Sequence, residues 1–334
     1  MRVTSLTYHL VTLPLRKEIK HASHARRTSE NILVRCRLAD GTEGWGEGIP
    51  RPYVTDETPD GLFRQQAATP WPEQIDRDCT DWHDVVDVCR NIRPTVLEED
   101  PRQCRSNAHR CAVELSLLDA YGRLFGEPVH AVARCFPPAH SVLASLTEVR
   151  YSGAVMAESR RKEAVSAIKM RLYGFAHCKV KVGLEGADDP ARLRRIRRWL
   201  GRSMDVRIDA NEAWHGSELV SRIEPLLDYR ISCVEQPVPH AEVDALVDLR
   251  SALPVPVMLD ESLTSVVDAE RAIGRGTCDL FNIRLSKCGG FLDSLQLAAM
   301  AKAAGLGYQM GCHPGESGIL SAAGRHFGTT VADI

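Results

Sequence analysis

The repeat that begins after about residue 140 limits the fold more than any other feature of the sequence. Short β-branched runs alternate there with polar, helix-forming stretches, and the runs are AHCKVKVG, MDVRIDA, ISCVEQP, VPVMLDES, CDLFNIRLS and LGYQMGC. A segment near residues 141–156 adds a first strand, and VADI at the end can begin an eighth. Repeated βα units predict an α/β fold with a parallel, TIM-type (β/α) barrel. An open doubly wound sheet is the alternative, although no glycine-rich phosphate turn follows an early strand.

The first 130 residues follow a different pattern, which is typical of a smaller α+β domain. Two alternating segments in ENILVRCRLADGTEGWGEG flank Asp40-Gly41 and predict a hairpin in an antiparallel sheet. The segment SNAHRCAVELSLLDAYGRLFGEPV has apolar residues at helical spacing and ends at Gly126, which predicts one long buried helix. The pattern between them, from about 56 to 100, is irregular. We expect an α+β domain over 1–130 and the barrel over 131–334.

The composition narrows the class of partner. A formal net charge of −2 gives no overall field that would favour nucleic acid or an anionic membrane. No stretch of 18 apolar residues and no signal-peptide pattern occurs. The eleven cysteines include no CxxC pair and no zinc-finger spacing, which indicates reduced thiols. We expect a cytoplasmic homo-oligomer that acts on a small molecule, with no nucleic-acid or membrane partner.

Three carboxylates recur at the ends of strand-like runs. Asp209, Glu235 and Asp260 are separated by 26 and 25 residues, and Lys181 lies 28 residues before the first of them. One βα unit separates each pair, so a barrel would bring all four to the mouth where active sites of this fold lie. Oxygen ligands in an incomplete cage suit Mg²⁺. The alternative is that each carboxylate caps the helix after its strand.

Two lysines alternate with two valines on the first of these strands. Lys179 and Lys181 therefore share one side of the strand, which in a parallel barrel is the packed interior. An ammonium group crowded by a second cation and a metal has its pKa lowered, which makes it a general base. The alternative, a surface-facing edge strand, does not suit a barrel, because a barrel has no edge.

The ordered set KVKVG, DANEAW, VEQP and LDES, with a Gly-Gly after the sixth strand, resembles the muconate-lactonizing subgroup of the enolase superfamily. That subgroup includes muconate cycloisomerases, o-succinylbenzoate synthases and dipeptide epimerases. The resemblance covers essentially the whole chain, because the N-terminal segment also resembles the capping domain of this family. It implies an enolase-superfamily barrel with an N-terminal α+β capping domain.

The resemblance also implies roles for individual residues. Lys181 would be the base, and Lys179 an electrostatic partner of the substrate carboxylate. The implied Mg²⁺ ligands are Asp209, Glu235 and Asp260. Three neighbouring residues remain candidates for supporting those ligands, or for surface or capping roles: Asn211, Gln236 and Glu261.

The sixth strand departs from the subgroup, which carries a second lysine there on the opposite face of the substrate. This chain has Arg284 at that position, and Lys287 three residues later falls on the other face of the strand or in the following loop. Arginine stays protonated, so it stabilises an anion but accepts a proton poorly. We therefore expect Arg284 to favour one-base chemistry over epimerisation.

His313, in GCHPGES after the seventh strand, lies near the position where the mandelate-racemase branch of the superfamily carries a catalytic histidine. It is a candidate for a second acid or base, and its alternative is a loop histidine that contacts substrate or solvent. Arg284 nearby would lower the pKa of this histidine. Glu316 has a similar standing, with placement at a helix N-terminus as its alternative.

Two loops of the capping domain, near 17–30 and 49–58, are expected to cover the substrate. The first is basic, which suits an anionic distal group on the substrate or a solvated surface. Its basic residues are Lys20, His21, His24, Arg26 and Arg27. Tyr53 in the second loop would pack on the substrate or on the loop itself. Matched to the family, the chain ends inside the eighth strand, before residues that usually complete the pocket.

The sequence as a whole predicts Mg²⁺-dependent removal of the proton next to a substrate carboxylate, through an enediolate. A muconate cycloisomerase-like isomerase or lyase fits this best. The alternatives are an acid-sugar or related dehydratase, a dipeptide epimerase, or a catalytically silent barrel that binds a small carboxylate.

Overall fold

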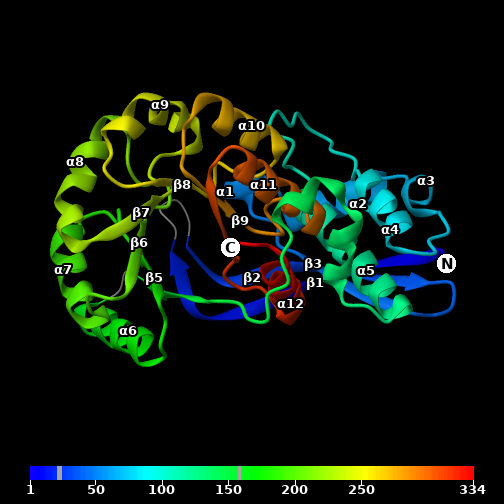
Figure 1. Ribbon diagram of the computed structural model, residues 1–334. Helices are drawn as coiled ribbons and strands as arrows, with labels where there is room; N and C mark the ends of the chain where they lie inside the picture. Colours follow the sequence, from blue (N-terminus) through cyan, green and yellow to red (C-terminus); the bar gives the residue numbers. More distant parts are fainter. Residues whose placement is uncertain (21–24, 157–158) are drawn as a thin grey trace.

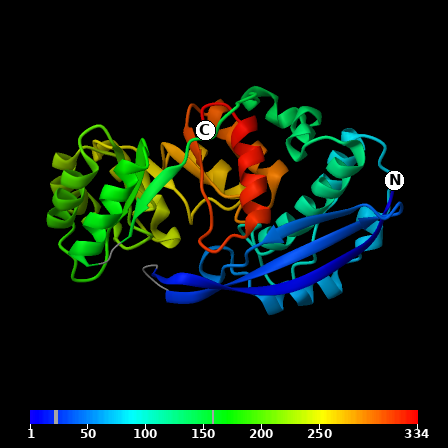
Figure 2. The same cartoon turned by 90° about the horizontal axis from the view of Figure 1, so that it is seen from below.

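The computed structural model describes residues 1–20, 25–156 and 159–334 and contains two sheets surrounded by helices (Figure 1). The N-terminal sheet is antiparallel, in the order β1-β2-β3. Its strands are β1 Val3–Lys20, β2 Ala25–Leu38 and β3 Glu43–Gly48. Seen from below, these long strands form one layer along the molecule, with the green and yellow helices beyond its end (Figure 2).

The second sheet has seven parallel strands in the order β10-β9-β8-β7-β6-β5-β4. Its strands are β4 Ser152–Val155, β5 His177–Lys181, β6 Asp205–Asp209, β7 Ile231–Glu235, β8 Val257–Leu259, β9 Leu280–Ile283 and β10 Gly307–Met310. Each strand pairs with the next one along the chain, so the predicted βα succession is confirmed.

The sheet curls but does not close, and of the barrel strands expected above it contains seven. Over the described ranges no strand joins β10 to β4, and VADI does not form an eighth strand. Val331 instead forms an isolated antiparallel bridge with Leu143, and the N–H of Ala332 donates to the carbonyl of Val142 at 2.8 Å. These bonds occupy the backbone that a parallel eighth strand would need.

Helices cover both sheets. The N-terminal ones are α1 Pro52–Thr55, α2 Pro59–Ala68, α3 Trp71–Ile75, α4 Trp82–Asn91, α5 Asn107–Phe125, η1 Val129–Cys135 and η2 Pro137–Val142. Those among the parallel strands are α6 Arg160–Leu172, α7 Asp189–Leu200, η3 Gly216–Glu218, α8 Leu219–Ile223, η4 Glu224–Tyr229, η5 His240–Ala245, α9 Leu246–Leu249, η6 Arg250–Ala252, α10 Val266–Arg275, α11 Phe291–Ala303 and α12 Gly318–Thr330.

The hairpin and the long buried helix predicted for the N-terminal segment are confirmed. Asp40 and Gly41 lie in the turn between β2 and β3, and Gly41 has φ 91°. Helix α5 ends at Gly126, whose φ of 67° is the left-handed conformation of a helix cap. A side chain at Gly44 or Gly46 of β3 would collide with the backbone of α5. These glycines therefore let the helix lie directly on the sheet.

Residues 56–100 are more regular than the sequence indicated. They contain α2, α3 and α4. Asp81 caps the N-terminus of α4, because its carboxylate accepts hydrogen bonds from the N–H groups of His83 and Asp84. An aspartate at this position is a helix-start signal that the sequence contains. Its apolar face, including Trp82 and Val85, is buried.

Buried carboxylates from the N-terminal elements bind the helices that flank β9 and β10. Glu114 of α5 accepts hydrogen bonds from the first two N–H groups of α11, at 2.5 and 3.1 Å. Glu47 of β3 accepts the N–H groups of Ser317 and Leu320 at the start of α12, both at 2.9 Å. Negative charge at a helix N-terminus is favourable, so these contacts fix the N-terminal elements on this side of the parallel sheet.

Candidate active site

The predicted carboxylates meet at one edge of the parallel sheet. Asp209 ends β6, Glu235 ends β7 and Asp260 follows β8, and these three strands are neighbours. All three residues are fully buried. Lys181 lies in register beside Asp209, and Asp209 beside Glu235. The three carboxylates and Lys181 therefore lie together, as their spacing in the sequence predicted.

The two lysines of β5 face these carboxylates from the inner side of the sheet. Lys179 Nζ lies 2.8 Å from Asp209 Oδ2 and 2.9 Å from Glu235 Oε1. Lys181 Nζ lies 2.6 Å from Asp209 Oδ2 and also contacts the side-chain oxygen of Asn211. Both lysine side chains are less than a fifth exposed, at 17% and 18%.

The same strand gives its two lysines different acid–base properties. Burial lowers the pKa of Lys181, and although Asp209 opposes this shift, the charge of Lys179 adds to it. Burial also acts against the charged form of Lys179, but the carboxylates of Asp209 and Glu235 outweigh it and leave its pKa raised. Lys181 is therefore the better proton acceptor, and Lys179 stays charged.

Two further residues bind Glu235 and were not singled out from the sequence. Arg207 Nε donates to Glu235 Oε2 at 2.9 Å, and Asn282 Nδ2 donates to Glu235 Oε1 at 2.9 Å. Arg207 precedes Asp209 by two residues on β6, so strand alternation alone places it on the same face. The signal for Arg207 was therefore present in DVRIDA.

Asp260 is held by the two cations that follow β9. Arg284, in the position where the family has a second lysine, contacts Asp260 Oδ2 directly. Lys287 lies in the turn after the strand, as one of the two sequence expectations had it, and is 1% exposed. Its Nζ donates to the carbonyl and to Oδ1 of Asp260, at 2.6 and 3.0 Å. Burial lowers the pKa of Lys287 to about 8.

The residues next to the carboxylates are buried, so the surface role left open for them is wrong. Asn211 Nδ2 donates to Glu261 Oε1 at 3.1 Å. Gln236 Oε1 accepts the backbone N–H groups of Asp260 and Ser262, at 2.9 and 3.1 Å. The left-handed φ angles of Asn211 and Gln236, 45° and 36°, turn the chain sharply after β6 and β7. These bonds connect the loops that carry the three carboxylates.

His313 is also buried at this edge, and the side chain of Glu316 beside it is 14% exposed. The carboxylate of Glu316 accepts the N–H of His313 at 2.5 Å, and its Oε1 lies 4.0 Å from His313 Nδ1. Burial, then the charges of Arg284 and Arg51, lower the pKa of His313 well below its ordinary value. Burial raises the pKa of Glu316 to about 7. A solvent-facing role for His313 does not fit its 4% exposure.

The segment expected as a first loop is mostly strand, since β1 runs to Lys20 and β2 starts at Ala25. Arg26 of β2 and Arg51, which precedes α1, reach the same region. Arg26 donates to the hydroxyl of Tyr53 at 2.9 Å and to the carbonyl of Pro314 at 3.1 Å. Arg51 is 5% exposed and donates to Ser29 Oγ at 2.7 Å. Arg26 and Arg51 therefore lie over the segment that carries His313.

Arg27 of the first loop is exposed and pairs with Glu18 at 3.5 Å, away from these contacts. The other basic residues of that loop, the side chain of Lys20 together with His21 and His24, lie outside the described part of the chain.

The chemistry of the donor set fits a magnesium ion. Asp209, Glu235 and Asp260 offer buried carboxylate oxygens on adjacent strand ends, the ligand type that Mg²⁺ prefers. Ammonium and guanidinium groups contact these oxygens, and across the described ranges no group of three His, Cys, Asp or Glu side chains lies close enough to hold a metal ion. Binding of Mg²⁺ would require Lys179 and Arg284 to release oxygens that they now contact.

Comparisons with known proteins identify the family. Residues 161–334 match the family model described as Enolase C-terminal domain-like. The chain belongs to the enolase superfamily. Its homologues there are enzymes, among them muconate cycloisomerases and dipeptide epimerases. The resemblance drawn from KVKVG, DANEAW, VEQP and LDES is thereby confirmed.

Similar proteins cover nearly all of this enolase-superfamily chain. Muconate cycloisomerase 1 of Rhodococcus opacus is 30% identical over 337 residues, 98% of this chain and 84% of that protein. The hydrophobic dipeptide epimerase of Enterococcus faecalis is 27% identical over 340 residues, 100% of this chain and 89% of that protein. A solved dipeptide epimerase from Cytophaga hutchinsonii, complexed with Mg and the dipeptide D-Ala-L-Val, has a TM-score of 0.81 at 27% identity, over 98% of this chain and 83% of that one.

None of the helices in the described ranges has the length and apolar character needed to span a bilayer.

Proposed function

We propose that this chain is a Mg²⁺-dependent enzyme that removes the proton next to a substrate carboxylate, with Lys181 as the base. The observation that carries the proposal is the pair of lysines on β5, which face three buried carboxylates at the carboxyl ends of β6, β7 and β8. Active sites lie at that end of parallel barrel strands. The similar proteins named above add that related chains act on small carboxylates or dipeptides.

Removal of this proton places a second negative charge on the substrate carboxylate, and the site must stabilise it. Asp209, Glu235 and Asp260 would hold Mg²⁺, which when bound supplies positive charge at the carboxylate oxygens. Lys179, held charged by Asp209 and Glu235, would bind the same carboxylate group. Lys181, less than a fifth exposed, would accept the proton at Nζ.

The opposite face of the substrate would be lined by Arg284. Because a guanidinium group stays protonated, Arg284 would stabilise the enediolate without accepting a proton. His313 is the remaining candidate for a second proton-transfer group, and burial together with Arg284 favours its neutral form. We therefore infer proton transfer on the Lys181 face, as in a muconate cycloisomerase-like reaction, and not two-base epimerisation.

The distal part of the substrate would meet Arg26 and Arg51. Arg51 is nearly fully buried, and its Nε has no hydrogen-bond partner in the described part of the chain. A buried guanidinium with an unsatisfied donor favours an acceptor on the ligand. The proposal therefore includes a substrate with an acceptor or negative charge at its distal end.

The experiment is Mg²⁺-dependent incorporation of solvent deuterium into a pooled library of carboxylates and dipeptides. The proposal expects exchange that requires Mg²⁺ and keeps the configuration of the substrate. Epimerisation at a rate comparable with exchange would require a second base, and His313→Asn would then test whether His313 is that base. Binding of a carboxylate without exchange, with or without Mg²⁺, would instead identify a catalytically silent barrel.

A further inference from the structure

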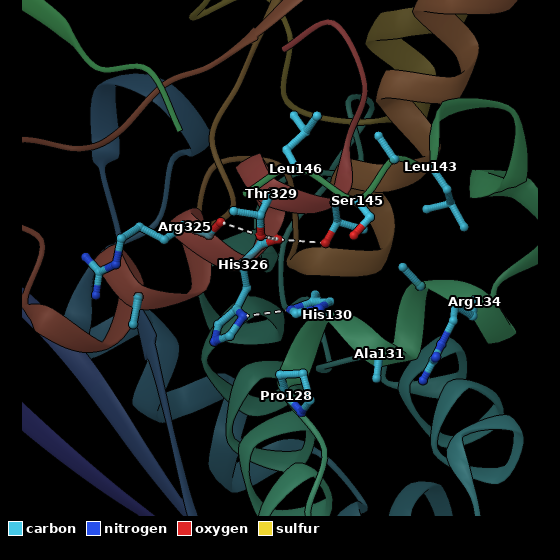
Figure 3. A pocket seen from close by; sticks show the side chains of 14 residues that line it. Pro128, His130, Ala131, Arg134, Leu143, Ser145, Leu146, Arg325, His326 and Thr329 are labelled. Carbon is cyan, nitrogen blue, oxygen red and sulfur yellow. Dashed lines mark hydrogen bonds between the residues drawn. The ribbon is translucent and has the colours of Figure 1, made fainter. Parts of the chain in front are cut away.

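A separate cavity lies on the flank of the molecule where η1 and the end of α12 meet (Figure 3). Its volume is about 690 Å³, within the range of small-molecule sites. Helix α12 connects this cavity with the candidate active site, because its first residues follow Glu316 and its last turns line the cavity. Gly318 and His326 are separated by about 12 Å of helix. The cavity is therefore distinct from the strand ends described above.

The side chains around this cavity are basic and apolar. Its basic residues are His130, Arg134, Arg325 and His326. No aspartate or glutamate lines it in the part of the chain that the structure describes. Leu143 and Leu146 form an apolar side, and 41% of Leu146 is exposed. This combination suits a ligand with one anionic group and an apolar body.

The two histidines form the centre of the cavity. His130 Nδ1 and His326 Nδ1 are 3.0 Å apart, and the ring centroids are 5.2 Å apart (Figure 3). One hydrogen bond between two Nδ1 atoms needs one N–H and one lone pair, so both rings cannot be protonated while it persists. Burial lowers the pKa of both rings, helped by Arg134 at His130 and by His130 and Arg325 at His326. The pair therefore presents at most one free N–H at each outer ring nitrogen, and the nearby arginines supply the positive charge for an anion.

The two arginines differ in how far their charge is already used. Arg134 donates to the carboxylate of Glu127 at 2.8 Å. Arg325 is exposed and forms no ion pair with any residue of the described ranges, and it lies on the other side of the histidine pair in Figure 3. A charge-assisted hydrogen bond is the stronger kind, so Arg325 is the better partner for an anion.

We propose that this cavity binds a small organic anion, with its carboxylate or phosphate group between Arg325 and the histidine pair and its apolar body against Leu143 and Leu146. The inference does not depend on the proposed function of the strand-end site. Because η1 and α12 both line the cavity, such a ligand also links the N-terminal elements to the last helix.

The test uses the full chain with three probes at constant ionic strength: phenyl phosphate, benzoate and inorganic phosphate. The strand-end site also carries lysine and arginine side chains, so the primary readout is local: the side-chain NMR signals of His130 and His326. Saturable shifts of both signals with phenyl phosphate or benzoate are expected, and the two probes separate a phosphate site from a carboxylate site. Unchanged signals with all three probes would overturn the proposal. Inorganic phosphate binding as tightly as phenyl phosphate would overturn the apolar part.

Variants locate the binding. Arg325→Gln is expected to weaken binding of the better probe by about tenfold or more, because it removes a charge-assisted contact. The double variant Arg325→Gln with His326→Asn should bind the probe more weakly still. The His326→Asn change keeps the backbone carbonyl that accepts the Thr330 hydroxyl, so this helix contact is retained. Arg198→Gln, an exposed arginine on α7, is the matched control and should bind like wild type. Equal affinity in Arg325→Gln and Arg198→Gln would overturn the assignment.

Discussion

The two halves of the parallel sheet are supported in different ways. Strands β8–β10 and their helices are held by buried side chains of the N-terminal elements: Glu47 binds the start of α12, Glu114 the start of α11, and Asn107 donates to the carbonyls of Thr264 and Lys287 at 2.6 and 2.7 Å. Strands β4–β7, with α6–α8, extend to the far end of the molecule in Figure 1. We call these the supported half and the outer half.

The candidate active site lies across the junction of the two halves. The ladder between β7 and β8 has two residue pairs, one of them Glu235 with Met258. Side chains add to it, since Asn282 binds Glu235 and Asn211 binds Glu261. Lys181 belongs to the outer half and Arg284 to the supported half. The proposed base, Lys181, therefore lies in the less anchored half. Its alignment depends on this ladder and on the side-chain bonds across the junction, which include those of Gln236 to Asp260 and Ser262.

The sharpest test of the comparison removes one cation from each half. Lys181→Ala should lower solvent-deuterium exchange by about a thousandfold or more, the size of effect expected for a general base. Arg284→Lys should retain exchange on the Lys181 face and gain exchange on the other face, because lysine accepts protons and arginine does not. The measurement is NMR of deuterium incorporation with stereochemical assignment of the product.

Circular dichroism of both variants controls for folding. Normal exchange in folded Lys181→Ala would contradict the assignment of the base to the outer half, and would turn attention to Lys287 or His313.

The second test compares two buried carboxylates, one that holds the supported half and one within the outer half. Glu114→Ala leaves the first N–H groups of α11 without their acceptor and should cost about 3 kcal/mol of unfolding free energy. Glu163→Ala in the outer half breaks the contact with Arg192, 2.8 Å away, that ties α6 to α7, at a similar cost.

Hydrogen exchange measured by mass spectrometry distinguishes the two variants. Amides of α11 should lose protection in Glu114→Ala, and amides of α6 and α7 in Glu163→Ala. Loss of protection over the whole chain in both variants would mean that the halves open together, and the distinction between them would fail.

The sequence predicts the strand ends of this site because a parallel sheet brings the carboxyl ends of neighbouring strands to one edge. Asp209, Glu235 and Asp260 follow from that rule, and Lys179 and Lys181 from strand alternation. Arg207 obeys the same alternation, so its place in the site could also have been predicted from the sequence. The contacts of Lys287 could not be predicted in this way, because they depend on how the turn after β9 folds back onto Asp260.

The partner of the last residues was the part of the fold that sequence could not predict. The βα rhythm counts strands, but closure depends on a ladder between the first and last of them, which are far apart in the chain. The end segment instead bonds to residues 142–144, through Ala332 and Thr330. No periodicity within VADI signals that partner.

The third test concerns Asp260, the one proposed Mg²⁺-binding carboxylate that belongs to the supported half. Asp260→Asn keeps the size of the side chain and an oxygen for Arg284 and Lys287, so the fold should persist. Loss of the charge should weaken Mg²⁺ binding by about ten- to a hundredfold, or about 1.4–2.7 kcal/mol, measured by calorimetry. Unfolding of this variant at ordinary temperature would instead make Asp260 a structural residue of the supported half. Asp279→Asn, at the amino end of β9 and so at the opposite edge of the sheet from Asp260, is a control that should leave Mg²⁺ affinity unchanged.

The smallest expected effect compares a histidine from each region as the pH falls. His109, on α5, is fully buried between the Tyr8 hydroxyl at 3.1 Å and the Gln65 side-chain oxygen at 3.2 Å. Burial lowers its pKa to about 3, so the folded state binds fewer protons than the unfolded one between pH 3 and 6.5. Its contribution to stability is present at pH 7 and should fall by about 2 kcal/mol by pH 5.

His215 in the outer half is exposed, and its hydrogen bond to Glu242 raises its pKa, so its contribution is present at low pH and lost as the pH rises. Urea unfolding at pH 7 and pH 5 measures both: His109→Gln should be less stable at pH 7 yet flatter with pH, whereas His215→Gln should keep the acid sensitivity of wild type. An unchanged acid slope in His109→Gln would show that the N-terminal support does not owe its acid sensitivity to this ring.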